Sequence, residues 1–180
     1  METYIAFLRA INVGGHAVVK MDALKKIFES AGMKNVKTYI QSGNVIFDST
    51  EKDEKKLQKK IEKKLLAELK FEVPVLLRTY NELQKVSEKD PFKKFKNGKE
   101  QMVYVAFFHE EPGKEIQKTL EALCTKLETY KTAGRELFCL CKRDTKGQTN
   151  FSNNLIEKKS GMTATTRNMN TINKMISLKS

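Results

Sequence analysis

The spacing of apolar residues in the first 80 positions predicts two helices and four strands. Residues 4–8 are an unbroken apolar run, which indicates a strand buried on both faces. Leu24, Ile27, Phe28 and Ala31 recur at helical spacing, and Gly32 is suited to end that helix. The expected order is strand 4–8, helix 21–31, strand 36–40, strand 45–48, helix 52–70 and strand 73–78. This βαββαβ order is typical of the ferredoxin-like arrangement, in which two helices cover one face of a four-stranded antiparallel sheet.

The second half of the chain repeats most of this order. Residues 81–88 predict a short helix capped by Asn81, and residues 90–99 form a basic loop that suits a boundary between the halves. The elements expected after this loop are strand 102–108, helix 116–125, strands 127–131 and 136–141, helix 149–159, extended segment 161–165 and helix 168–178. The last strand is therefore expected to be short or missing. No residue-level repeat is visible between the halves, so duplication is inferred from element order alone.

We therefore predict an α+β protein with two ferredoxin-like halves, the second modified and followed by an added C-terminal helix. A chain of 180 residues is long enough to bury a sizeable core. The predicted boundaries are residues 1–80 for the first half, 81–100 for a helix and basic linker, and 101–180 for the second half with its terminal helix.

The charge balance is strongly basic. Lys and Arg number 34 against 22 Asp and Glu, which gives a formal net charge of +12, densest on the predicted helix 52–70. Such a chain suits nucleic acid or another polyanion, although a lysine-rich solvated surface explains the same composition. Three cysteines, with neither a secretory signal nor a membrane-spanning apolar run, predict a soluble cytoplasmic protein that makes no membrane contact.

Three polar segments lie in strongly apolar surroundings, at residues 9–15, 41–44 and 165–168. They contain two arginines, several amides and hydroxyls, and no carboxylate, so they suit an anionic or polar ligand better than acid–base chemistry. The candidate ligand-binding residues are Arg9, Asn12, Gly14, Gly15, Gln41, Ser42, Asn44, Thr166, Arg167 and Asn168.

Each segment also has a structural explanation. Gly14 and Gly15 follow a strand and precede a helix, where free backbone N–H groups hold phosphates, but the sequence matches neither the Walker nor the dinucleotide pattern. These glycines equally suit a loop that needs them for its shape. Arg9 follows a buried strand, so it either pairs with a carboxylate (Glu2, Asp22 or Asp48) or offers its guanidinium to a ligand.

The other two segments divide in the same way. Turn chemistry explains Ser42 and Asn44 without a ligand, whereas Gln41 is not a typical turn residue. We expect Asn168 or a neighbouring threonine to cap the last helix. An arginine at position 167, in the first turn of that helix, would oppose the helix dipole unless an anion lies there.

The sequence indicates no reaction. His16 and His109 have no cysteine or histidine at metal-ligand spacing, so neither a metal site nor a cofactor is predicted. Cys139 and Cys141 share one strand face and are interpreted as core residues. Core packing also explains the aromatic residues of strand 102–108 better than base stacking does. Whether the chain is an enzyme is left open.

The three polar segments resemble motifs of the bacterial domain-of-unknown-function family 1697. The resemblance rests on residues 7–15 (FLRAINVGG), 39–45 (YIQSGNV) and 164–171 (ATTRNMNT). The family usually has Gly where Ala10 stands and Trp where Met169 stands. The resemblance implies two ferredoxin-like halves and a cytoplasmic protein, and it brings no established activity, catalytic residue or cofactor.

These observations lead to one main functional hypothesis. The chain is expected to bind a small ligand that carries a phosphate or carboxylate group, through its Arg, Asn and Gln segments. The alternative is a nucleic-acid-associated protein that uses its lysine surface, and the third hypothesis is an enzyme of unidentified reaction. A purely structural role for all three segments is the remaining interpretation. The sequence makes no prediction of oligomeric state.

Overall fold

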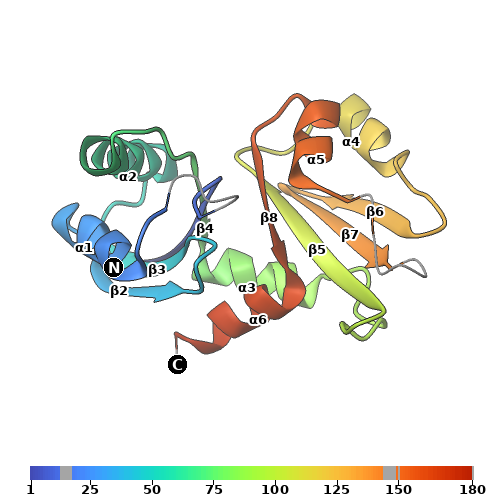
Figure 1. The fold of residues 1–180 in the computed structure, drawn as a ribbon, viewed down its shortest axis with the longest axis horizontal. Coiled ribbons are helices and arrows are strands. Elements are labelled where there is room, and N and C mark those ends of the chain that lie inside the picture. The colour runs from blue at the N-terminus through green and yellow to red at the C-terminus, as the bar shows by residue number, and fades with distance from the viewer. Residues whose placement is uncertain (13–17, 144–148, 150, 180) are drawn as a thin grey trace. The chain divides into compact units, whose positions relative to one another are not determined.

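The computed structural model describes residues 1–12, 18–143, 149 and 151–179. The chain divides into two compact units, residues 1–83 with Lys179 and residues 84–178. Each unit is built on one four-stranded sheet with flanking helices (Figure 1). Within the described residues, no helix has the length and apolar character needed to cross a membrane.

The first unit has the predicted βαββαβ order. Its elements are β1 (Glu2–Leu8), α1 (Met21–Ser30), β2 (Lys34–Tyr39), β3 (Asn44–Ser49), α2 (Glu54–Leu69) and β4 (Val75–Thr79). The strands lie in the order β2-β3-β1-β4, and every neighbouring pair is antiparallel. This is the strand order of a ferredoxin-like sheet, so the prediction for this half is confirmed.

Side-chain alternation along β1 explains why this strand is the centre of the unit. Tyr4, Ala6 and Leu8 belong to the core cluster that α1 and α2 complete from one side of the sheet. Ile5 and Phe7 point to the other face and are also buried. The unbroken apolar run therefore marks a strand buried on both faces, as the sequence predicts.

The second unit has the same strand order, β6-β7-β5-β8, with all neighbours antiparallel. Its elements are β5 (Gln101–Phe108), α4 (Lys114–Glu121), β6 (Glu128–Ala133), β7 (Glu136–Lys142), α5 (Asn153–Ser160) and β8 (Ala164–Asn168). The last strand, which the sequence analysis expects to be short or missing, is present as the five-residue β8, the shortest strand of this sheet, and it lies at 164–168 rather than in the predicted extended segment 161–165. β8 pairs with β5 over five residue pairs, as many as β4 makes with β1. Both halves are therefore complete, and a helix follows each: α3 (Tyr80–Glu88) and α6 (Met169–Ser177).

The strand registers also reveal a residue-level repeat that the sequence analysis missed. Residues 4–8 (YIAFL) and 104–108 (YVAFF) occupy the same register in the two sheets. Ile5 pairs with Arg78 on β4, and Val105 pairs with Arg167 on β8. Each half therefore carries an arginine at the same place on its last strand.

Two hydrogen bonds repeat at equivalent positions. A helix glutamate accepts from the first residue of the last strand in each half: Val75 N donates to Glu62 Oε1 at 2.9 Å, and Ala164 N donates to Glu157 Oε1 at 2.9 Å. The second repeated bond joins the last residue of the first strand to the hairpin turn: Leu8 N donates to Gly43 O at 2.8 Å, and Phe108 N donates to Arg135 O at 2.9 Å. Matching register and matching hydrogen bonds support a duplicated βαββαβ-plus-helix unit.

The helix after each sheet begins directly at the end of the last strand. Thr79 and Glu82 form a capping box on α3: Glu82 N donates to Thr79 Oγ1 at 3.2 Å, and Thr79 N donates to Glu82 Oε2 at 2.8 Å. The predicted cap at Asn81 is therefore wrong by two residues. On α6 the predicted cap at Asn168 is confirmed, because its Oδ1 accepts from Thr171 N at 2.8 Å.

Candidate functional site

Two of the three polar segments lie against each other in the first unit. Residues 9–12 leave the end of β1, and residues 40–44 form the turn from β2 into β3. Leu8 N donates to Gly43 O at 2.8 Å, and Asn12 Nδ2 donates to Gln41 O at 2.8 Å. We refer to residues 9–12 and 40–44 together as the Arg9 edge.

The two asparagines of the Arg9 edge hold its backbone in shape. The Asn12 side chain bonds both backbone groups of Val19, with Nδ2 donating to Val19 O at 3.0 Å and Val19 N donating to Oδ1 at 2.7 Å. Asn44 is fully buried and donates to Tyr39 O and Ser42 Oγ, each at 3.0 Å. Structure alone accounts for the buried Asn44 amide, which must be hydrogen-bonded, and for the half-buried Asn12 amide, whose nitrogen and oxygen both bind backbone groups.

Arg9, Gln41 and Ser42 are the ligand candidates of this edge that reach solvent. Arg9 is half-buried, while Gln41 and Ser42 are exposed. The Arg9 backbone is fixed, because its N–H donates to Pro74 O at 2.9 Å. The edge thus presents a guanidinium, an amide and a hydroxyl from an anchored backbone. The predicted residues Gly14 and Gly15 lie outside the described residues.

The backbone of the Arg9 edge is strained. Ala10, Asn12 and Ile40 have φ of 58°, 55° and 49°, in the left-handed region that costs an L-residue roughly 1–2 kcal/mol. Ile40 is β-branched and 47% exposed, so burial does not explain its conformation. Gly43 also has positive φ, and a Cβ there would lie 2.6 Å from Ile11 Cδ1. Strain concentrated in two touching segments is typical of functional loops.

The third polar segment lies in the second unit, and its arginine is not where the sequence analysis expects it. Arg167 is on strand β8 rather than in the first turn of α6, so the helix-dipole argument for an anion fails. Its side chain is buried and Nη1 donates to Thr165 Oγ1 at 2.9 Å and to Thr166 O at 2.8 Å. Thr166 Oγ1 donates to Asn153 Oδ1 at 2.9 Å. Burial lowers the pKa of the Arg167 guanidinium to about 10.

The equivalent arginine of the first half, Arg78, was missed by the sequence analysis. It is 1% exposed, and its Nη1 donates to Leu77 O at 2.6 Å. The signal was present, since Arg78 ends an apolar run as Arg9 does. Because Arg78 and Arg167 share a register position and a bond to the preceding carbonyl, the repeat explains both without a ligand.

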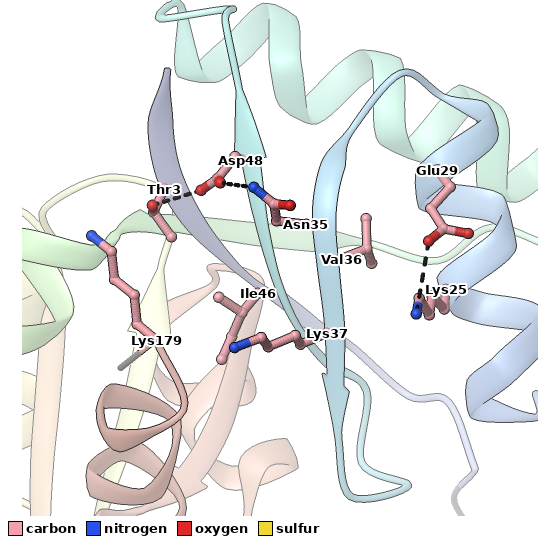
Figure 2. A pocket seen from close by; sticks show the side chains of 9 residues that line it. All are labelled: Thr3, Lys25, Glu29, Asn35, Val36, Lys37, Ile46, Asp48 and Lys179. Carbon is pink, nitrogen blue, oxygen red and sulfur yellow. Dashed lines mark hydrogen bonds and ion pairs between the residues drawn. The ribbon is translucent and has the colours of Figure 1, made fainter.

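A cavity of about 630 Å³ on the first unit was also missed (Figure 2). It is lined by Thr3, Lys25, Glu29, Asn35, Val36, Lys37, Ile46, Asp48 and Lys179. These residues come from α1, from three strands and from the chain end, so no sequence motif contains them. Three amines and two carboxylates give the cavity mixed charge.

The Asp48 carboxylate lines this cavity and is held in place by two hydrogen bonds. Thr3 Oγ1 donates to its Oδ1 at 2.6 Å, and Asn35 Nδ2 donates to its Oδ2 at 2.7 Å (Figure 2). Burial opposes the charged form, but these hydrogen bonds outweigh it, so the pKa of Asp48 lies below its ordinary value. Lys25 pairs loosely with Glu29, at 3.9 Å. Because its pKa is lowered, the Asp48 carboxylate stays negatively charged and opposes the binding of an anion. The cavity is therefore a weaker anion site than its lysines suggest.

Two of the three cysteines, Cys139 and Cys141, belong to the core, as predicted, whereas Cys124 is exposed. Cys139 and Cys141 are buried in the second unit with their sulfur atoms 3.2 Å apart. Burial raises the pKa of the Cys139 thiol, which keeps it protonated. Within the described part of the chain, no group of three or more His, Cys, Asp or Glu residues is arranged to hold a metal ion.

Comparison with known proteins adds a family and a fold. The chain is similar to the solved structure of the conserved bacterial protein SP0830 from Streptococcus pneumoniae, with a TM-score of 0.73 and 22% identity over 99% of each chain. At that identity the likeness shows the fold alone. A search of curated proteins finds no match.

A family model matches residues 1–138, a range that contains both segments of the Arg9 edge and ends before the third polar segment. Ala10 has a left-handed backbone. Glycine, which the family resemblance leads us to expect at this position, adopts that backbone without steric strain. The chain belongs to the family described as "Protein of unknown function (DUF1697)".

Proposed function

We propose that the first half binds a small ligand carrying a phosphate or carboxylate group at the Arg9 edge. The observation that carries the proposal is a difference between the repeated halves. Twelve residues (9–20) separate β1 from α1, whereas five (109–113) separate β5 from α4. Four residues (40–43) join β2 to β3, whereas two (134–135) join β6 to β7. Among the described residues of these longer connections, 9–12 and 40–43 lie against each other at one end of the first sheet and, with Asn44, make up the Arg9 edge.

The chemistry of this edge selects the ligand class. Residues 9–20 and 40–44 contain no carboxylate. A guanidinium donates two parallel hydrogen bonds to a carboxylate or phosphate, and the Gln41 amide and Ser42 hydroxyl add neutral donors. Such a donor-rich edge repels cations and favours anions. Asn12 and Asn44 shape the edge, while Arg9, Gln41 and Ser42 make the contacts.

Thermal stability in the presence of nucleotides, phosphorylated metabolites and carboxylates tests this proposal. A ligand at about 100 times its dissociation constant stabilises the folded state by about 2.7 kcal/mol. The stabilisation should be lost in Arg9→Gln and reduced in Gln41→Ala. Lys25→Gln is the matched control, because it removes the same charge from the cavity of Figure 2.

The Lys25→Gln control also shows which result would contradict the proposal. A ligand shift that survives Arg9→Gln and disappears in Lys25→Gln would overturn the proposal and move the site to the cavity. The prediction that Thr166, Arg167 and Asn168 contact the ligand stays a prediction. It requires Arg167→Met to weaken ligand binding under conditions in which the variant, although less stable, is still fully folded.

The proposal includes the cytoplasmic location predicted from the sequence. Cys124, Cys139 and Cys141 are all free thiols, which suits a reducing compartment. Fractionation of cells that express the chain with a C-terminal tag tests the location. Recovery of the tagged chain outside the cytoplasmic fraction would contradict it.

A further inference from the structure

The connection between α3 and β5, which can be followed in Figure 1, differs from the Arg9 edge in its residues. Residues 91–99, the part of the predicted loop 90–99 that follows Asp90, are called the basic loop from here on. They read PFKKFKNGK and contain no carboxylate, with Asp90 before them and Glu100 after them. The four lysines are Lys93, Lys94, Lys96 and Lys99, and all are exposed. The six lysines of α2 are different, because three glutamates on the same helix offset half of their charge. The positive charge per residue is therefore higher in the basic loop than on this helix, where the sequence analysis placed its maximum. The basic loop is therefore a concentrated positive surface.

The basic loop is held in one shape by hydrogen bonds along its length. Phe92 N donates to Asp90 Oδ1 at 2.8 Å, and Phe95 N donates to Phe92 O at 2.8 Å. At its other end, Val103 N donates to Asn97 Oδ1 at 2.6 Å. A preformed loop loses little entropy when it binds.

Phe95 projects from this frame. It is 41% exposed, and among the residues that the structure describes no other phenylalanine or tyrosine is exposed. Its ring packs edge-on against the buried Phe92 ring, with centroids 6.4 Å apart at 61°. Phe92 thus anchors the loop while Phe95 leaves part of its ring in water. Core packing does not explain Phe95.

Two further cations come from the end of β7. Lys142 pairs with Gln101 in the sheet, and Arg143 N donates to Glu100 O at 2.9 Å. Both Lys142 and Arg143 are exposed. Cations from a second chain segment therefore lie next to the end of the loop that carries Phe95.

We propose that the basic loop, with Lys142 and Arg143, binds single-stranded nucleic acid. Lysines contact the phosphates, and the Phe95 ring stacks on an unpaired base. An unpaired base is required because a duplex hides its base faces. A membrane surface fits less well, since the loop exposes one apolar side chain and buries the other phenylalanine, whereas interfacial segments insert a broad apolar face. This proposal concerns the second half and is independent of the Arg9 edge.

Fluorescence anisotropy with labelled oligo-U RNA and oligo-dT DNA, each about 12 nucleotides long, tests the proposal. Affinity should fall roughly 20- to 50-fold between about 50 mM and about 200 mM salt, as expected for three or four neutralised phosphates. The triple variant Lys93→Gln, Lys94→Gln, Lys96→Gln should weaken binding at least about tenfold. The matched control is Lys55→Gln, Lys59→Gln, Lys63→Gln on α2, which removes the same charge and should leave affinity within about twofold.

Variants of Phe95 test the stacking contact separately. Phe95→Ala should weaken binding about five- to 100-fold. Phe95→Leu should weaken it similarly, because leucine keeps the bulk and loses the flat face. Equal loss in both lysine triples, or full affinity in Phe95→Leu, would overturn the proposed interface. So would wild-type protein that binds vesicles of phosphatidylserine and phosphatidylcholine but neither oligonucleotide.

Discussion

In the first half, twelve residues lead from β1 to α1 and four turn from β2 to β3, whereas the second half uses five and two for the same connections. The sheets beneath these connections have the same strand order, and they carry the same YxAF run at the same register. The scaffold is therefore the same in both halves, and the connections at one end of the sheet differ in length. The difference teaches that equivalent positions, such as Arg78 and Arg167, report on structure, while unmatched positions, such as Arg9 and Gln41, are where function is to be sought.

The largest effect is expected from the two buried arginines. Arg78→Ala and Arg167→Ala should each lower the free energy of unfolding by about 3 kcal/mol, because each change leaves a cavity and removes hydrogen bonds from a charged donor. Urea denaturation measures this. Replacement with methionine keeps much of the side-chain volume and should cost less than alanine at both sites. If Arg167→Met left stability unchanged while Arg78→Met lowered it, the equivalence of the two positions would fail.

A smaller effect is expected at the two hairpin turns. Gly43→Ala places a Cβ 2.6 Å from Ile11 Cδ1 and 2.9 Å from Leu8 Cβ, at a φ of +76°. We expect a loss of about 2–3 kcal/mol from this clash and from the left-handed backbone. Gly134→Ala in the second half meets nothing closer than 3.8 Å, so only the backbone cost of about 1 kcal/mol applies. Thermal unfolding of both variants compares the turns, and equal losses would show that the close packing of the Arg9 edge has been overestimated.

The smallest effect has the opposite sign. Ala10→Gly relieves the left-handed strain at φ 58° and should raise the free energy of unfolding by about 0.5–1 kcal/mol, after the added entropy of the unfolded chain is subtracted. Ala67→Gly on the exposed face of α2 is the control, and it should lower stability by about 0.5–1 kcal/mol. Denaturant midpoints separate the two. If Ala10→Gly lowered the free energy of unfolding, Ala10 would not be in a strained left-handed conformation.

Apolar periodicity predicted both sheets and most of their helices, and it failed where polar side chains are buried. β8 reads Ala-Thr-Thr-Arg-Asn, which has neither an apolar run nor a clear alternation. It is a strand because it pairs with β5, and the hydrogen bonds of Thr166 and Arg167 satisfy its polar groups. Long-range pairing of this kind leaves no local signal, so the prediction placed Arg167 in a helix.

The candidate site, like the fold, could be predicted from the sequence only in part. The sequence proposed Asn12, Gln41 and Asn44 as candidates and set Gln41 apart because glutamine is not a typical turn residue, but it gave no means of telling whether the two asparagines shape the edge or contact a ligand. In the structure, Asn12 bonds Val19 and Asn44 bonds Tyr39, so both side chains hold the loop backbone in place. The cavity around Asp48 could not be predicted, because its lining residues are far apart along the chain.

The sequence by itself determined the α+β class, the βαββαβ order, the central buried strands and the polar segments that interrupt them, because local spacing and turn chemistry encode these. Only the tertiary structure decided that residues 9–12 touch residues 40–44, that Arg167 is the counterpart of Arg78, and that the two halves share a register. Pairing between distant segments depends on the whole sheet being assembled, and no window of the sequence contains that information.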